Sequence, residues 1–204
     1  MTPRVVVLDY GSGNLRSACR ALDRAGARVV LSADPGEAVR ADGLVVPGVG
    51  AYAACMAGLA RTGGVDAIRE RVDAGRPLLG ICVGFQILFE HGVEHGVDSA
   101  GCGVLPGTVE RLAARRLPHM GWNRVDPPQD SSLFDRVADE WFYFVHSYGV
   151  RRSTAEGAAW CVHERNGFLA AVESDIVSGT QFHPEKSGAA GGRLLTNWVS
   201  GVMC

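Results

Sequence analysis

Short apolar runs alternate with segments of helical periodicity over the first part of the chain. Each run predicts a strand, and the runs cover 4–9, 28–31, 43–46 and 77–79; the first is of the kind buried on both faces, and the last is also read as a buried strand. Helical spacing of apolar residues predicts helices over 15–25, 52–59 and 65–74, and a short helix over 35–40. Strands that alternate with helices predict a parallel, doubly wound sheet flanked by helices.

The pattern changes after residue 89. Residues 91–103 are rich in glycine and acidic residues and predict a loop, and residues 118–123 predict a compact turn. Further strands are expected over 107–112, 140–145, 160–164, 168–173 and 176–182, with Asn166-Gly167 as a hairpin turn, followed by an amphipathic helix over 192–203. These strands predict an antiparallel layer added to the α/β core. The 204 residues are expected to form one domain, 1–204.

A cysteine lies between the strand at 77–79 and a helix predicted over 86–90. Gly80 and Gly84 flank Cys82 at two residues on each side, and glycine permits the backbone angles and close approach that a tight strand-to-helix turn needs. Unpaired N–H groups at the start of a helix favour a thiolate. A buried structural cysteine is the alternative, but it has no need of flanking glycines. The pattern therefore favours a nucleophile.

A histidine ends the last predicted strand. Pro184 biases His183 toward extended backbone, and side chains two residues apart on an extended chain point to one side, so Glu185 is expected to meet His183. A carboxylate beside an imidazole fixes its tautomer and stabilises its charged form. None of the other histidines has such a partner in the sequence, so His183 is the predicted base.

Two glycine-containing turns follow strands of the predicted sheet. Residues 47–50, Pro-Gly-Val-Gly, lie at the edge where open α/β sheets bind ligands, and they fit either an oxyanion site or an ordinary loop. Gly11-x-Gly13 resembles part of a dinucleotide-binding turn, but Arg16 stands where a third glycine would be needed. A tight turn is therefore favoured at residues 11–13.

Composition narrows the range of partners. The net charge is −2, without the basic excess that would suggest nucleic acid or an acidic membrane. No apolar run is long enough to span a bilayer, and no signal peptide is recognised at the N-terminus. The six cysteines have neither metal-ligand nor CxxC spacing. We expect no metal and no cofactor, and a reducing cytoplasmic location.

Together these motifs resemble those of the class I (triad) glutamine amidotransferases. The elbow at 80–86 and His-Pro-Glu at 183–185 carry the resemblance to the class. The combination with four further stretches is similar to the glutaminase subunits that serve a (β/α)8-barrel cyclase in histidine biosynthesis; these stretches are 9–17, 47–52, 118–123 and 143–148. Because 204 residues cannot hold a barrel as well, the resemblance implies a heterodimer with a separate cyclase subunit.

The resemblance also implies the roles of the catalytic residues. Cys82 would attack the side-chain amide of L-glutamine, and His183 would protonate the departing ammonia and then activate water. Glu185 would orient His183. The backbone donors to the oxyanion would be Val83 together with one from Gly48 or Val49. In this family, segment 47–50 would direct its N–H at the oxyanion only when the complex of glutaminase and cyclase is active.

The remaining roles concern substrate and partner. The residues expected to hold glutamine are Gly50, Gln86, Glu94, Ser147 and Tyr148. The residues expected at the interface with the cyclase are Asn14 and Lys186, which lie beside motifs on the active edge of the sheet; a solvated charge is the alternative for Lys186.

Three other functions fit part of the sequence. A glutaminase subunit serving a synthase of pyridoxal phosphate or anthranilate is opposed by Pro-His-Met-Gly-Trp-Asn at 118–123. A non-catalytic binding module on the same fold is opposed by the intact Cys82, His183 and Glu185. A cysteine peptidase of similar fold is opposed by Gln86 and by the His-Pro-Glu context.

Overall fold

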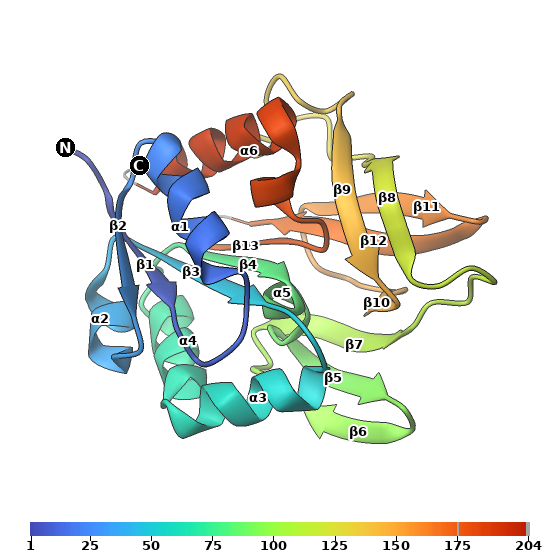
Figure 1. The fold of residues 1–204 in the computed structure, drawn as a ribbon, viewed down its shortest axis with the longest axis horizontal. Coiled ribbons are helices and arrows are strands. Elements are labelled where there is room, and N and C mark those ends of the chain that lie inside the picture. The colour runs from blue at the N-terminus through green and yellow to red at the C-terminus, as the bar shows by residue number, and fades with distance from the viewer. Residues whose placement is uncertain (175, 203–204) are drawn as a thin grey trace.

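A seven-stranded sheet forms the centre of the molecule in the computed structural model, which describes residues 1–174 and 176–202 (Figure 1). Its strand order is β11-β12-β13-β4-β3-β1-β2. The parallel strands are β1 (Arg4–Leu8), β2 (Arg28–Ser32), β3 (Gly43–Gly48), β4 (Leu78–Cys82) and β13 (Val177–Thr180). The antiparallel strands β11 (Ala158–His163) and β12 (Asn166–Glu173) extend one edge. The strands expected over 160–164, 168–173 and 176–182 therefore belong to the central sheet and not to an added antiparallel layer, and the last of them runs parallel to β4. The predicted mostly parallel α/β sheet is confirmed.

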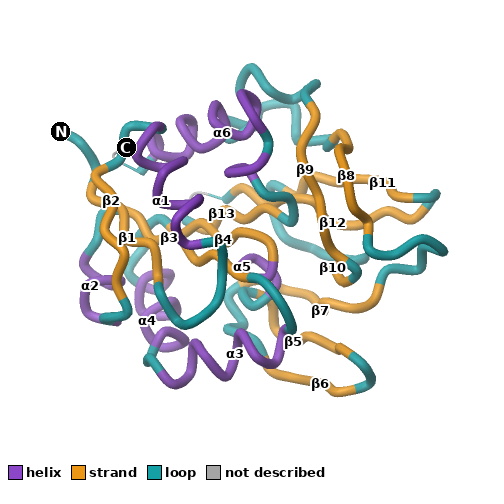
Figure 2. The backbone as a smooth tube through the Cα atoms, in the orientation of Figure 1, coloured by secondary structure: helices purple, strands orange, loops and turns teal. Residues whose placement is uncertain are grey.

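Helices cover both faces of this sheet, as Figures 1 and 2 show. On one face lie α1 (Leu15–Arg24) and α6 (Gly188–Gly201), and on the other lie α2 (Pro35–Arg40), α3 (Tyr52–Arg61) and α4 (Gly64–Asp73). The apolar runs of β1, β3 and β4 are almost fully buried between the two helical layers, as expected of strands in a parallel sheet. Met203, the last residue of the predicted closing helix, lies outside the described residues, as does Cys204.

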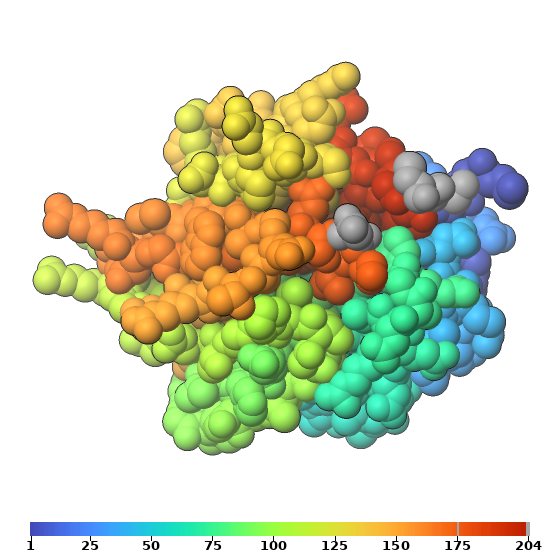
Figure 3. Space-filling view, turned by 180° about the vertical axis from the view of Figure 1, so that it is seen from behind, coloured from blue at the N-terminus to red at the C-terminus, as the bar shows by residue number. Residues whose placement is uncertain are grey.

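Two smaller sheets form the layer added to this core. One has the order β10-β7-β5-β6, with β5 (Phe89–Glu94), β6 (Val97–Ala100), β7 (Leu105–Arg111) and β10 (Tyr148–Val150). The other pairs β8 (His119–Arg124) with β9 (Trp141–His146). Seen from behind, the orange β11–β12 hairpin lies between the green segment that carries α4 to β7 and the yellow segment before β9 (Figure 3). The layer is antiparallel except where β5 and β7 run parallel.

The structure corrects two predictions between residues 86 and 103. The helix after Cys82 is α5 (Val83–Gln86), so residues 89 and 90 belong to a strand and not to the predicted helix 86–90. The predicted loop 91–103 contains the β5–β6 hairpin, whose Glu94 pairs with Val97. Its two turn residues, His95 and Gly96, both have positive φ, as a tight hairpin turn requires. Glycine and charge in this segment therefore mark a solvent-facing hairpin.

Two further predictions are wrong in detail. Residues 118–123 are not a compact turn, because β8 runs through 119–124 and every residue of it pairs with β9. The β11–β12 hairpin turns at Glu164-Arg165 and not at Asn166-Gly167, since His163 pairs with Asn166. Both turn residues have positive φ, so the hairpin tolerates non-glycine residues where a tight turn prefers asparagine and glycine.

A buried arginine on α4 binds the segments that follow α2 and precede β3 and β4. The Arg71 side chain is fully buried, and burial lowers its pKa to about 10. Its guanidinium donates hydrogen bonds of 2.7–3.1 Å to backbone carbonyls; the acceptors belong to Ala38, Val39, Ala41, Asp42 and Pro77. These carbonyls lie at the end of α2 and before β3 and β4. The last carbonyls of a helix have no N–H partner within the helix, and Arg71 supplies hydrogen-bond donors to those of α2.

Candidate active site

Cys82 occupies a strained turn at the end of the central strand β4. Its φ is 56° and its ψ is −115°, and a positive φ is uncommon for a residue with a side chain. Gly84, two residues further on, is pressed against β3, since a Cβ there would lie 1.9 Å from the carbonyl oxygen of Val46. Such strain persists only where the surroundings enforce it, and it is concentrated at functional sites. The elbow predicted around Cys82 is present, although α5 spans only four residues and its dipole is correspondingly small.

Pairing of β13 with β4 carries His183 to Cys82. Thr180 lies opposite Ile81 in the parallel ladder, so both chains leave the sheet at the same edge. The ring of His183 is buried, and its Nδ1 lies 2.8 Å from Oε1 of Glu185. The expected meeting of the two side chains therefore occurs. Its geometry differs from the prediction, because Pro184–Lys186 forms the 3₁₀ turn η1 and does not continue the extended strand.

Charge stabilises the protonated form of His183. Burial alone would lower its pKa, but hydrogen bonds and charge interactions with Cys82 and Glu185 outweigh burial and raise the pKa to about 9. At neutral pH the arrangement therefore favours an imidazolium between a sulfur and a carboxylate. An imidazolium in this position has a proton ready for a leaving group, and a positive charge beside a cysteine sulfur is the environment in which cysteine nucleophiles are found.

Strand β9 fixes the backbone of His183. The His183 N–H donates to the carbonyl of Tyr143 over 2.9 Å, and the Ser187 hydroxyl donates to the His183 carbonyl over 2.7 Å. Ser187 in turn accepts from the Tyr143 N–H. These bonds join η1 to β9 and fix the backbone position from which the imidazole extends.

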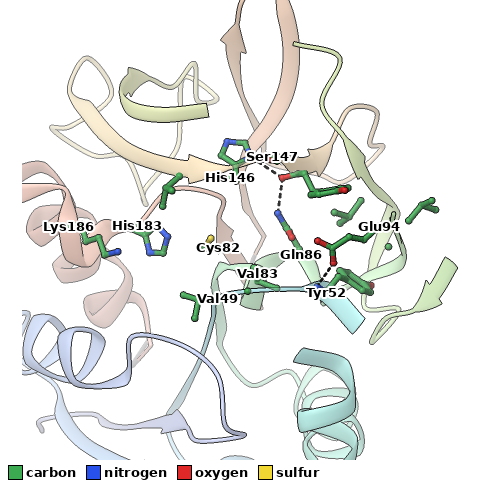
Figure 4. A pocket seen from close by; sticks show the side chains of 16 residues that line it. Val49, Tyr52, Cys82, Val83, Gln86, Glu94, His146, Ser147, His183 and Lys186 are labelled. Carbon is green, nitrogen blue, oxygen red and sulfur yellow. Dashed lines mark hydrogen bonds between the residues drawn. The ribbon is translucent and has the colours of Figure 1, made fainter. Parts of the chain in front are cut away.

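A cavity of about 240 Å³ opens beside Cys82 and His183 (Figure 4). All five residues predicted to hold substrate line it: Gly50, Gln86, Glu94, Ser147 and Tyr148. Val49, Val83 and Lys186 line it as well. Asn14 lies instead at a smaller cavity on the other side of segment 47–50, beside His183 and Glu185. Tyr52 and His146 also line the main cavity, and sequence reasoning did not place them there.

Two acceptors lie next to each other in the cavity wall, as Figure 4 shows for Gln86 and Glu94. Gln86 Nε2 donates to the Tyr148 carbonyl over 2.8 Å and to Gln181 Oε1 over 2.9 Å. Both amide hydrogens are then used, which leaves Gln86 Oε1 to accept a hydrogen bond. The Glu94 carboxylate accepts from the Tyr52 N–H at the start of α3 over 2.8 Å and keeps further lone pairs. This part of the cavity suits a cationic donor.

Segment 47–50 is held by hydrogen bonds that the sequence did not predict. The Val49 N–H donates to Ser12 Oγ over 3.1 Å, and the Ser12 hydroxyl donates to the Val49 carbonyl over 2.8 Å. The Cys55 thiol donates to the same carbonyl over 3.3 Å. The Val49 N–H is therefore already engaged in this conformation. Val83 begins α5, so its N–H is one of the helix-start donors that lack an intrahelical acceptor.

In residues 1–174 and 176–202, no group of three or more His, Cys, Asp or Glu is arranged to hold a metal ion. Across the same residues, no helix has both the length and the apolar character needed to cross a membrane.

Comparison with known proteins places this geometry in context. Residues 6–200 match the family model for glutamine amidotransferase class-I. The chain is 56% identical to imidazole glycerol phosphate synthase subunit HisH of Corynebacterium glutamicum, over 98% of this chain and 99% of that protein. It is 59% identical to the protein of the same name from Mycobacterium tuberculosis, over 97% of this chain and 98% of that protein. The structure of PurLQS from Thermotoga maritima has the same fold, with a TM-score of 0.76 at 21% identity, over 100% of this chain and 98% of that one.

Proposed function

The chain belongs to the class-I glutamine amidotransferase family, and we propose that it is the glutaminase subunit of an imidazole glycerol phosphate synthase. In this role it hydrolyses L-glutamine to glutamate and ammonia for histidine biosynthesis. The observation that carries the proposal is the buried Cys82–His183–Glu185 arrangement at the edge of a cavity with paired acceptors. Relatives at 56–59% identity with the same subunit name support the choice of synthase.

The reaction we propose proceeds through a thioester. The Cys82 thiolate attacks the side-chain amide carbon of glutamine, and His183 gives its proton to the departing ammonia. His183 then accepts a proton from the water that attacks the glutamyl thioester, and glutamate leaves as the Cys82 sulfur is released. Glu185 holds Nδ1 of His183 and thereby directs Nε2 toward the reacting atoms.

We assign the rest of the cavity to substrate binding. Glu94 and Gln86 Oε1 accept hydrogen bonds from the α-ammonium group of glutamine, since both are acceptors and lie next to each other. Gly50, Ser147 and Tyr148 complete the cavity wall around the substrate.

The oxyanion site is incomplete in this conformation. Val83 contributes one backbone donor, and the second donor comes from Gly48 or Val49 of segment 47–50. Because the Val49 N–H is engaged by Ser12, we propose that the segment reorients when the synthase is active. Such gating prevents hydrolysis of glutamine when there is no acceptor for ammonia.

We propose that the partner is a (β/α)8-barrel cyclase subunit, with which the chain forms a heterodimer. The cyclase uses the ammonia to form imidazole glycerol phosphate and aminoimidazole carboxamide ribotide. Asn14 and Lys186, on either side of segment 47–50 and His183, are assigned to the interface. Met120 and Trp122 on β8 are exposed, which favours contact with a partner there. This surface adjoins the active site, since Trp122 packs on Tyr143, whose carbonyl accepts from the His183 N–H. The single domain 1–204 would act in the cytoplasm with this partner and without a cofactor or metal.

A serine substitution at the nucleophile tests the proposal. Cys82→Ser, co-purified with a cyclase subunit of the barrel type, is expected to lose glutamine-dependent synthesis and to keep ammonia-dependent synthesis, because only the thiolate is removed. Glutamate release and product formation are measured separately. Full glutamine-dependent synthesis by the variant, or no binding between wild-type chain and cyclase at micromolar concentration, contradicts the proposal.

A further inference from the structure

A chain of hydrogen bonds, buried at its centre, runs from β8 to the substrate cavity. Asn123 Nδ2 lies 3.3 Å from His119 Nε2, His119 Nδ1 lies 3.1 Å from His146 Nε2, and His146 Nδ1 lies 2.9 Å from the Tyr148 carbonyl. The same carbonyl accepts from Gln86 Nε2 over 2.8 Å. Figure 4 shows both bonds converging on one oxygen, one from His146 and one from Gln86. We call Asn123, His119 and His146 the histidine relay.

The direction of every bond in the histidine relay is fixed by its inner end. A carbonyl oxygen only accepts, so His146 must carry a proton on Nδ1. A neutral imidazole then has an unprotonated Nε2, which accepts from Nδ1–H of His119. The Nε2 of His119 is consequently unprotonated and accepts from the Asn123 amide. Both rings are thus neutral Nδ1–H tautomers that donate toward the cavity.

The surroundings keep both rings neutral and in place. His119 is 4% and His146 is 6% exposed, and burial lowers their pKa values to about 4 and about 3. His119 stacks between Phe144 and His163, with centroid distances of 4.8 and 4.2 Å, which limits rotation of its ring. A neutral His146 also avoids repulsion from the cationic His183 nearby.

We propose that His119 and His146 are positioning residues for glutamine binding, which act through the Tyr148 carbonyl and the Gln86 side chain. The inference rests on the proposed glutaminase function of the cavity. The Tyr148 carbonyl takes one hydrogen of the Gln86 amide and Gln181 takes the other. This is what turns Gln86 Oε1 toward the substrate. The histidine relay holds the Tyr148 carbonyl in the position where it accepts from Gln86. The relay starts on β8, whose outer face is exposed.

Removal of the inner bond is expected to weaken substrate binding more than chemistry. In His146→Leu the KM for glutamine should rise about tenfold, the size expected for one buried hydrogen bond and its effect on Gln86. The kcat should change little, because leucine is neutral like the imidazole it replaces and Cys82 and His183 are untouched. His119→Leu should raise KM less, since His146 keeps its bond to the carbonyl.

Conservative and control variants separate this role from packing. Asparagine places an amide nitrogen near the position of histidine Nδ1, so His146→Asn can still donate to the Tyr148 carbonyl and should keep KM close to wild type. His163→Leu keeps an apolar side chain against the His119 ring and removes no member of the histidine relay, so it should also keep wild-type KM. All variants are assayed as the complex with the cyclase, with thermal unfolding as the check on folding.

Nitrogen NMR of the imidazole rings tests the inference without catalysis. Between pH 6 and 8, His119 and His146 of the wild-type chain should both give the spectrum of the neutral Nδ1–H tautomer. An Nε2–H tautomer at His146, a wild-type KM for His146→Leu, or an equal rise of KM in His163→Leu overturns it. If the wild-type complex releases no glutamate, the proposed function fails, and the NMR result still decides the tautomers.

Discussion

Removal of the Ser12 hydroxyl should activate the isolated chain. This hydroxyl accepts from the Val49 N–H and donates to the Val49 carbonyl, so Ser12→Ala breaks two of the three hydrogen bonds that hold Val49 in this conformation. The alanine side chain fits the space that serine occupied and touches neither Cys82 nor His183. The change therefore acts on the orientation of segment 47–50 and leaves the nucleophile and base intact.

The size of the effect follows from the two bonds. Each neutral hydrogen bond contributes about 0.5–1.5 kcal/mol net, so Ser12→Ala favours the open orientation by about 1–3 kcal/mol. This range corresponds to a shift of about 5- to 150-fold in the population of the competent state. One oxyanion donor is worth about a hundred- to a thousand-fold in rate, which sets the upper limit. Because the Cys55 thiol still holds the Val49 carbonyl, we expect a rise in basal glutaminase rate of about tenfold, at the lower end of this range.

The assay is glutamate release by the chain alone and by its complex with the cyclase and nucleotide ligand. Ser12→Ala should raise the rate of the chain alone and leave the rate of the full complex unchanged, so the ratio between them falls. Ser12→Thr keeps the hydroxyl and serves as the control. An unchanged basal rate in a folded Ser12→Ala variant, or an equal rise in Ser12→Thr, would refute the idea that Ser12 holds the segment.

Three further predictions concern the framework around the site. Gly84→Ala should abolish glutaminase activity, because its Cβ would meet the Val46 carbonyl at 1.9 Å and move the elbow; activity is measured alongside circular dichroism. Arg71→Met should lower the free energy of unfolding by about 3–5 kcal/mol in urea, since it strips donors from buried carbonyls, and Arg71→Lys should lower it less. His183, with its pKa raised from 6.5 to about 9, should give stability that is fully present below pH 6.5 and is lost as pH rises through 9. Urea unfolding of wild type against His183→Gln across this range measures that loss, and a stability difference independent of pH would contradict it.

Cys82 and His183 could be singled out from the sequence because residues next to each of them in the chain indicate an unusual local structure. Gly80 and Gly84 mark the elbow at Cys82, and Pro184 and Glu185 mark His183. The parallel sheet could be predicted because β1, β3 and β4 are buried on both faces and are therefore continuous apolar runs. These signals are local, and the structure places them at one sheet edge because β4 and β13 pair.

The features that could not be predicted depend on contacts between distant segments. The β5–β6 hairpin and β8 were missed because edge and surface strands carry glycine and charge, which also mark loops. Ser12 has no local signal, since its role depends on Val49 lying across from it in the fold. The histidine relay is likewise invisible in sequence, because His119 has its partner 27 residues further along the chain.

The place of β13 in the sheet has a consequence for synthesis of the protein. β13 is among the last strands to leave the ribosome, yet it lies between β4 and β12, and His183, the proposed base, reaches Cys82 only once β13 has inserted. On the proposed roles of Cys82 and His183, a growing chain that contains only Cys82 is expected not to hydrolyse glutamine. Because insertion joins strands that are far apart in sequence, it is expected to be a late and slow event in folding. Completion of the fold and completion of the active site are thus one event.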